Sequence, residues 1–208
     1  MLNYKFSNEI ISQTAKLIKS DITTHIVYEY PELQGIAGRI YCFAQNMPKE
    51  IAVCCEEHYK PKSFDDEIPT DELSILFSLA NKISDIIDNV VIDNLPSGTS
   101  DPFGLKKTAD GIIKIMLEKK YNLSLKDVVK QYVTKFNDNN VETEKIYLGT
   151  INFLKQRLES IYYLKGYKTD EIRAVISVFD GDVYNRSLVV EIIRTVRDKE
   201  EFGKMIEL

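Results

Sequence analysis

Apolar residues recur at three- and four-residue steps through almost the whole chain, and this period most constrains the fold. The longest run in helical phase comprises Leu73, Leu76, Leu79, Ile83, Ile86 and Val90. A period of 3.6 residues places such positions on one face of a helix, whereas a half-buried strand would alternate every two residues. No segment shows a convincing strand pattern, so the sequence predicts an all-α protein.

Proline, glycine and polar clusters divide this pattern into helices. The expected helical segments are 10–26, 37–45, 48–58, 73–90, 103–119, one beginning at Ser124, 142–164, 170–178 and 184–197. The run NDNN at 137–140 is the strongest break within the chain.

Composition limits the class of protein. The 208 residues are 44% hydrophobic, which is enough for one large or two small domains with a real core. A net charge of -5 argues against a free-standing, sequence-blind nucleic-acid binder, although a local basic face is compatible with it. Three cysteines, two of them adjacent, do not form a disulfide framework. With no apolar run near ~18 residues and a polar start, we expect a cytoplasmic protein without a membrane span.

Two histidines raise the possibility of a metal site. His25 follows Asp21 by four residues, His58 ends another expected helix, and Asn81 and Asp85 lie on the long helix. His and Asp side chains gathered from several helices can bind a divalent cation and activate water. The simpler alternative is that they are ordinary polar residues at helix ends and surfaces.

The order of these residues resembles the HD superfamily of helical phosphohydrolases. That family has an early histidine, a His-Asp pair on a second helix and a last aspartate on a long later helix. Here Ser20 stands before Asp21 in place of the histidine, and Asn81 replaces the last aspartate. Neutral serine and asparagine are weak ligands for such cations. The resemblance therefore implies a degenerate HD-like scaffold, with Ser20, Asp21, His58 and Asn81 at the former site and no metal; an HD-type metal-dependent phosphohydrolase is the alternative.

Three longer motifs point to a narrower family. YEYPELQGIAGR begins at Tyr28, a second segment runs from EEHYKP to LANK, and PSGTSDPFGLKK begins at Pro96. In this order they resemble the beta subunit of the bacterial two-subunit glycyl-tRNA synthetase. The matching residues are Glu29, Pro31, Glu32, Leu33, Gln34, Gly35, Gly38, Glu57, Tyr59, Pro61, Pro96, Gly98, Asp101, Pro102, Phe103, Leu105, Lys106 and Lys107. The sequence departs from the family pattern at Ser20, Ala37 and Asn81.

This resemblance implies that the chain is a fragment without an active site of its own. It implies a degenerate HD-like domain over 1–122, then a helical linker and the beginning of an anticodon-binding-like region over 123–208. In the family, ATP and Mg are used by the separate alpha subunit, so no cofactor is expected here. The implied partners are glycine tRNA, the alpha subunit and the rest of the beta subunit.

Several basic residues are candidates for contact with tRNA. Arg39 follows two glycines that allow close backbone approach, and Lys106 and Lys107 open a helix whose N–H groups suit a phosphate. Asp101 is a competing cap for the same groups. The alternative is that aromatic residues such as Tyr28 and Phe103 pack both loops against the long helix.

The C-terminal helices carry a second basic set. Arg157, Lys165, Lys168 and Arg173 lie near Tyr162, Tyr163 and Tyr167. Charge mixed with flat rings suits unstacked anticodon bases. The alternative is a solvated face with half-buried tyrosines. Arg157, Lys168 and Arg173 therefore join Arg39, Lys106 and Lys107 as predicted tRNA-binding residues.

Overall fold

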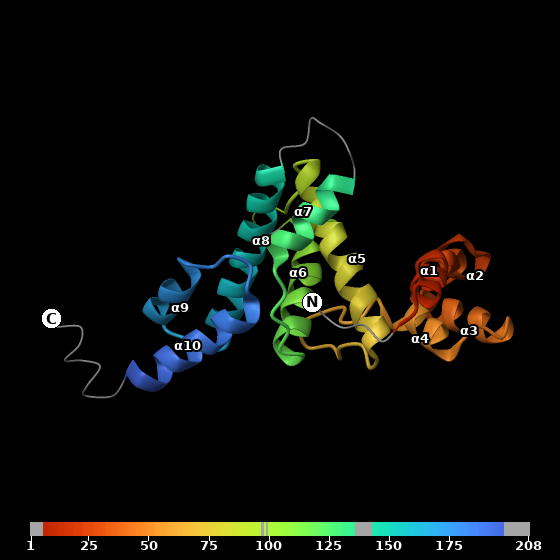
Figure 1. Cartoon of the computed structure of the whole chain (residues 1–208), viewed down its shortest axis with the longest axis horizontal. Helices are drawn as coiled ribbons and strands as arrows, with labels where there is room; N and C mark the ends of the chain where they lie inside the picture. The colour runs from red at the N-terminus through yellow and green to blue at the C-terminus, as the bar shows by residue number, and fades with distance from the viewer. Residues whose placement is uncertain (1–5, 97, 99, 136–142, 198–208) are drawn as a thin grey trace. The chain divides into compact units, whose positions relative to one another are not determined.

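The computed structural model describes residues 6–96, 98, 100–135 and 143–197. Across these ranges the chain forms ten α-helices and two short 3-10 helices and no strand (Figure 1). The prediction of an all-α fold is confirmed. None of the helices within these ranges is both long enough and apolar enough to cross a membrane.

The chain divides into two compact units, residues 1–82 and 83–208. The division falls inside α5 (Glu72–Val91), which continues through both units. The sequence places its boundary later, after residue 122. A division by contacts does not test where an HD-like domain ends, so that boundary stays a prediction.

The first unit is a chain of short helices. It contains α1 (Asn8–Leu17), η1 (Ser20–Thr23), α2 (His25–Glu29), η2 (Pro31–Leu33), α3 (Ile36–Ala44), α4 (Lys49–Glu57) and the beginning of α5. The prediction of one continuous helix over 10–26 is wrong, because α1 ends at Leu17. The Ser20 hydroxyl donates to the Leu17 carbonyl at 2.8 Å and the Thr23 hydroxyl to the Ser20 carbonyl at 2.8 Å. Side chains of this kind compete with the helix ladder and break it here.

The core of this unit lies between α3 and α4. Cys42 of α3 packs with Ile51, Ala52 and Cys55 of α4, and Cys54 packs with Ile18 and Leu73. All three cysteines are buried and free, and the Cys42 and Cys55 sulfurs lie 3.6 Å apart. Burial raises the pKa of the Cys54 thiol to about 12. These cysteines therefore act as small apolar packing residues.

The second unit contains the end of α5, α6 (Leu105–Glu118), α7 (Leu125–Lys135), α8 (Thr143–Leu164), α9 (Thr169–Ile176) and α10 (Val183–Arg197). Helices α6 and α7 pack against α8, and α9 packs against α10. A β-carbon at Gly149 of α8 would lie 2.7 Å from Cγ1 of Val90 in α5, so glycine permits this approach. The predicted break at 137–140 lies outside the described residues.

Candidate functional site

The buried carboxylate of Asp21 joins two segments of the first unit. Its Oδ2 accepts a hydrogen bond of 2.6 Å from the backbone N–H of Gly35, fourteen residues further along the chain. Asp21 is only 1% exposed, and its Oδ1 has no hydrogen-bond partner among the described residues. The low dielectric of a buried place strengthens such a hydrogen bond. Asp21 therefore holds η1 against Gly35, the residue just before α3.

The two glycines of the loop allow its backbone to pack closely. Gly35 has a φ of +86°, and a β-carbon there would lie 3.0 Å from Cδ2 of Tyr59 and 3.2 Å from the backbone of Glu56. A β-carbon at Gly38 would lie 3.3 Å from the Asp21 carboxyl carbon and from Cβ of Cys55. These glycines thus bring α3 against α4, where a ligand has no access to their Cα atoms.

The aromatic residues of the loops do not provide this packing. Tyr28 is 84% exposed, and Tyr30 and Phe103 are also exposed. The packing alternative is therefore wrong for these three rings, whereas Leu33, which it also includes, is half-buried. Tyr59 takes the role instead, since its ring contacts Gly35 and its hydroxyl accepts a hydrogen bond of 3.0 Å from the Gln34 amide.

His58 lies at the end of α4 and is fully buried. Its Nδ1 lies 3.0 Å from the Cys54 carbonyl oxygen, and its ring centroid lies 3.8 Å from that of Tyr59. Because the carbonyl can only accept, Nδ1 carries the proton and Nε2 keeps a lone pair. Burial lowers the pKa of His58 to about 4, and the positive charges of Lys19 and Lys82 act in the same direction. His58 is therefore neutral at physiological pH.

These residues do not fit the metal that an HD-like site would hold. Asp21 and His58 each offer one buried atom without a partner, but Ser20 is exposed and directs its hydroxyl to the Leu17 carbonyl. Asn81 on α5 contributes a neutral amide, and His25 is exposed. Within the described ranges no three His, Cys, Asp or Glu side chains are placed to share an ion. The arrangement supports no hydrolytic step, and the absence of bound metal stays a prediction.

A buried lysine that sequence reasoning missed holds the segment after His58. The Lys82 ammonium of α5 donates hydrogen bonds of 3.1 Å to three acceptors, the carbonyls of Tyr59 and Lys60 and the hydroxyl of Ser78. The sequence did contain a signal for this role. Lys82 falls on the same helix face as the apolar residues Leu79 and Ile83, and that face is buried.

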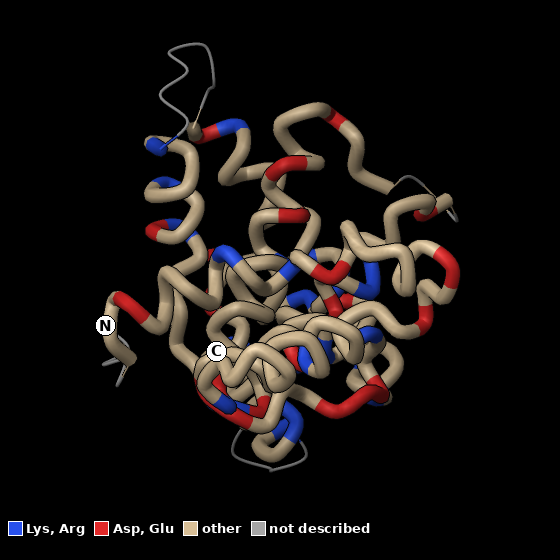
Figure 2. Tube along the Cα trace, turned by 90° about the vertical axis from the view of Figure 1, so that its right-hand side faces the viewer, with Lys and Arg blue, Asp and Glu red and all other residues tan. Residues whose placement is uncertain are grey.

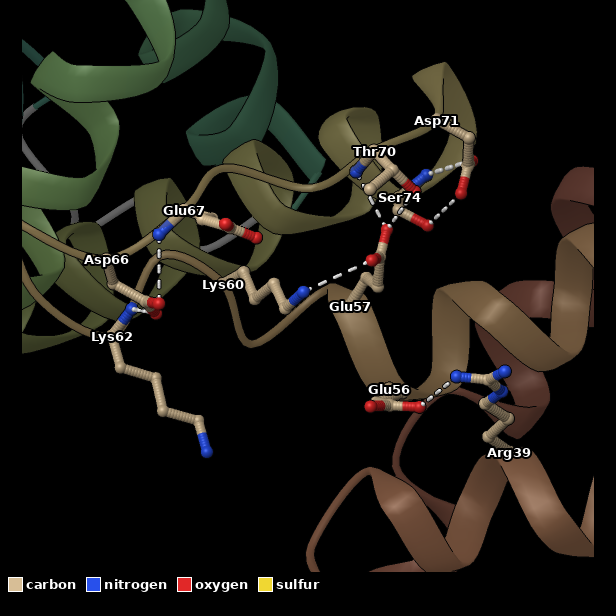
Figure 3. A network of polar contacts seen from close by, with 10 residues as sticks. All are labelled: Arg39, Glu56, Glu57, Lys60, Lys62, Asp66, Glu67, Thr70, Asp71 and Ser74. Atoms are coloured by element: carbon tan, nitrogen blue, oxygen red, sulfur yellow. Dashed lines mark hydrogen bonds and ion pairs between the residues drawn. The ribbon is translucent and has the colours of Figure 1, made fainter.

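A network of carboxylates ties the loop 60–70 to α4 (Figure 3). Glu57 accepts hydrogen bonds from the Thr70 backbone at 2.8 Å and hydroxyl at 2.7 Å, and it pairs with Lys60 at 3.3 Å. Burial alone raises the pKa of Glu57, but the two Thr70 bonds and Lys60 together bring it below its ordinary value. Its neighbour Glu56 forms an ion pair of 2.9 Å with Arg39. The guanidinium predicted to meet a phosphate is therefore engaged within the chain.

In the second loop, the Asp101 carboxylate caps the first turn of α6. Its Oδ1 accepts a hydrogen bond of 2.8 Å from the Leu105 N–H, and its Oδ2 accepts one of 3.0 Å from the Lys106 N–H. The Lys106 ammonium donates to the Gly98 carbonyl at 2.6 Å. A phosphate at this helix end would have to displace Asp101. Lys107 remains exposed on the same turn.

The C-terminal basic residues fall into two groups. Arg157 forms a two-point ion pair with Asp110 of α6, with both distances 2.9 Å, so it links α8 to α6. Lys168 and Arg173 have exposed side chains at the start of α9 and on it.

The tyrosines of this region mostly pack. Tyr162 is buried, and Tyr167 meets it edge-on with 5.4 Å between ring centroids. Sequence reasoning missed Arg194 of α10, whose guanidinium lies 4.2 Å from the Tyr167 ring centroid. Tyr163 is the exposed member of the three.

Comparison with known proteins identifies the family of this chain. A family model described as glycyl-tRNA synthetase beta subunit matches residues 2–177. The chain belongs to the glycyl-tRNA synthetase beta subunit family. The match spans both loops and all six predicted tRNA-binding residues, and it confirms the resemblance drawn from the three motifs. It does not test an HD-like or an anticodon-binding-like assignment within the chain.

Similar proteins bear the same name. The glycine–tRNA ligase beta subunit of Thermodesulfovibrio yellowstonii is 37% identical over 93% of this chain and 28% of its own length. The subunit of Sulfurihydrogenibium sp. is 35% identical over 95% of the chain and 27% of its own length. The beta subunit of Persephonella marina is 31% identical over 97% of this chain and 30% of its own length. The chain therefore spans less than a third of the length of these relatives.

Gly35→Ala is expected to destabilise the first unit by about 2–5 kcal/mol, from backbone strain at positive φ and from the contact of Cβ with Tyr59 and Glu56. Gly104→Ala is the control, since Gly104 has a φ of +67° but no atom within 4 Å of its β-carbon position. It is expected to cost about 1–2 kcal/mol of strain alone. Urea unfolding of both variants measures the difference, and equal losses would contradict close packing at Gly35.

The pKa of His58 predicts a loss of stability on acidification. Because the folded value of about 4 lies below the ordinary 6.5, the unfolded chain binds the proton more tightly. The contribution of the neutral His58 ring to the free energy of unfolding is fully present above pH 6.5. It is lost as the pH falls towards 4, and the total loss is about 3 kcal/mol. His58→Gln is expected to flatten this part of the pH profile of unfolding free energy. His25→Gln, which removes an exposed ring, is expected to keep the wild-type slope; the same slope in all three proteins would refute the account.

Proposed function

We propose that this chain is a non-catalytic part of a glycyl-tRNA synthetase beta subunit that contributes to recognition of glycine tRNA and to the architecture of the subunit. The ATP- and Mg-dependent attachment of glycine would take place on the alpha subunit. The observation that carries this proposal is the family match over residues 2–177. The chain would act in the cytoplasm, together with the alpha subunit and the rest of the beta subunit.

The geometry of the basic side chains ranks the residues proposed to contact tRNA. Arg39, Lys106 and Arg157 use their charged groups in contacts within the chain. Lys107, Lys168 and Arg173 have exposed side chains and form no ion pair with any described residue. We therefore assign the phosphate contacts to Lys107, Lys168 and Arg173. Contacts with phosphate fix position and register, whereas they carry no base sequence.

The charge distribution limits how strongly such a piece binds on its own. The net charge is -5, and Lys and Arg positions are interspersed with Asp and Glu along the chain (Figure 2). The attraction to RNA is then local, and repulsion from neighbouring carboxylates opposes it. We expect weak, strongly salt-dependent binding, to which the other parts of a full synthetase would add.

The first unit has a supporting role in this proposal. Its HD-like positions Asp21 and His58 are buried and hold the loop and the end of α4, as their contacts show. We propose that the first unit acts as a structural domain that positions surfaces for contacts with other proteins. The unpartnered Asp21 Oδ1 and His58 Nε2 are the only features among the described residues that favour a metal-dependent phosphohydrolase, and no third His, Cys, Asp or Glu side chain there is placed to share an ion with them.

Titration with glycine tRNA and an unrelated tRNA at low and moderate salt tests the proposal. Binding is expected to prefer glycine tRNA and to weaken as salt rises. The double reversal Lys107→Glu/Arg173→Glu is expected to weaken binding about tenfold or more and to lower the salt slope by about two. Lys49→Glu/Lys62→Glu is the matched control, because it makes the same charge change at exposed positions of the first unit.

Two outcomes would overturn the proposal. If the control reversal weakened binding as much as the test reversal, the effect would be one of net charge alone. If the wild-type chain did not bind tRNA at low salt, recognition would lie elsewhere in the synthetase. Formation of glycyl-tRNA by this chain alone with ATP and glycine would contradict its non-catalytic role.

A further inference from the structure

Helix α3 is apolar on two opposite faces. Its sequence, IAGRIYCFA, contains one charged residue, Arg39. The buried residues of α3 are Ala37, Gly38 and Cys42. Gly38 lies against Asp21 and Cys55, and Cys42 packs on α4. The opposite face carries large apolar side chains.

We define the outer face of α3 as Ile36, Ile40 and Phe43, which follow one another at spacings of four and three residues. Their exposed fractions are 40%, 58% and 42%. A helix that is hydrophobic all round is normally buried on all sides, and a surface helix normally presents polar residues to water. The outer face of α3 is therefore built for contact with another surface.

The neighbouring segments extend this apolar character. Eight of the eighteen exposed large hydrophobic residues among the described ones lie between positions 22 and 43. Four of the eight lie on α3 itself, namely Ile36, Ile40, Tyr41 and Phe43. Exposed large apolar residues are therefore concentrated on α3 and on the segment that precedes it.

The chemistry of this surface suits a protein and not RNA. The Arg39 guanidinium is held by Glu56 at 2.9 Å and lies 5.7 Å from the Phe43 ring centroid. The exposed charges on the preceding segment are the carboxylates of Glu29 and Glu32. An RNA site needs cations along the backbone path, whereas carboxylates repel phosphate. The matching surface is apolar, with Lys or Arg at its edge opposite Glu29 and Glu32.

We propose that the outer face of α3 is covered by another part of the same beta subunit polypeptide. The inference rests on the proposed function, in which this chain works within a longer beta subunit. The first relative is more than three times as long as the segment it shares with this chain, which covers 28% of it. A covering segment in the same polypeptide acts at a high effective concentration, so it needs no separate association step. Coverage within the subunit also keeps this apolar surface from water before the synthetase assembles.

Cysteine labelling tests this inference directly. The native Cys42, Cys54 and Cys55 are buried, so Ile40→Cys introduces one accessible thiol. Its labelling rate with a maleimide is measured in the 208-residue chain and in a full-length beta subunit that contains the same sequence. We expect labelling at least tenfold slower in the full-length beta subunit without any partner. Ser12→Cys, at an exposed position of α1, is the control and is expected to change less than twofold.

The other possible occupants give different results, and each would overturn the proposal. Protection that arises only when the alpha subunit is added would assign the face to that subunit. Protection of the 208-residue chain that grows with its concentration would indicate a second copy, and protection by added tRNA would indicate RNA. Equal, rapid labelling in every sample would show an uncovered face. Phe43→Cys provides the same readout if Ile40→Cys does not fold, as judged by its circular dichroism.

The labelling result is independent of tRNA affinity. A chain that binds glycine tRNA but is not protected in the full-length subunit would retain the proposed function and lose this inference. If Ile40→Cys were protected in the full-length subunit but the isolated chain did not bind tRNA, the inference would stand and the proposed function would fail. The two experiments therefore separate the two claims.

Discussion

The hydrogen bond from the Gly35 N–H to the buried Asp21 carboxylate fixes the arrangement of the first unit. It joins η1 to the beginning of α3 over 2.6 Å, across fourteen residues of chain. Because residue 35 is a glycine with a φ of +86°, the backbone can make this bond while it lies against Tyr59 and Glu56. The position of α3 on α4 follows, and with it the direction of the apolar outer face.

The same unit shows how buried polar residues can serve packing. Asp21 binds a backbone N–H, and the neutral His58 ring donates to a carbonyl and lies beside Tyr59. Lys82 and Glu57 then hold the chain that follows through hydrogen bonds to its backbone. Asp21, Glu57 and Lys82 thus fix loops of this unit, whereas His58 binds within α4.

The sequence predicted the helices well and the contacts between them poorly. The apolar period over 73–90 identified α5, observed as Glu72–Val91, because burial of one face determines that period. The break after Leu17 was missed, since it depends on hydroxyl groups and not on apolar spacing. Pairing of Arg157 with Asp110, 47 residues away, depends on the packing of α8 on α6, which no local pattern encodes. For the same reason the sequence could name Arg39 and Lys107 as candidates but could not tell that one is paired and the other exposed.

The claim that Asp21 holds the loop without a metal is tested most directly by thermal unfolding of the wild type and Asp21→Ala, each with EDTA and with added Mn²⁺. We predict that Asp21→Ala is destabilised by about 2 kcal/mol or more, because the Gly35 N–H is left buried without an acceptor. The wild-type midpoint should be the same with EDTA and with Mn²⁺. A wild-type midpoint that falls with EDTA and rises with Mn²⁺, together with loss of both effects in Asp21→Ala, would contradict the account and show a surviving metal site.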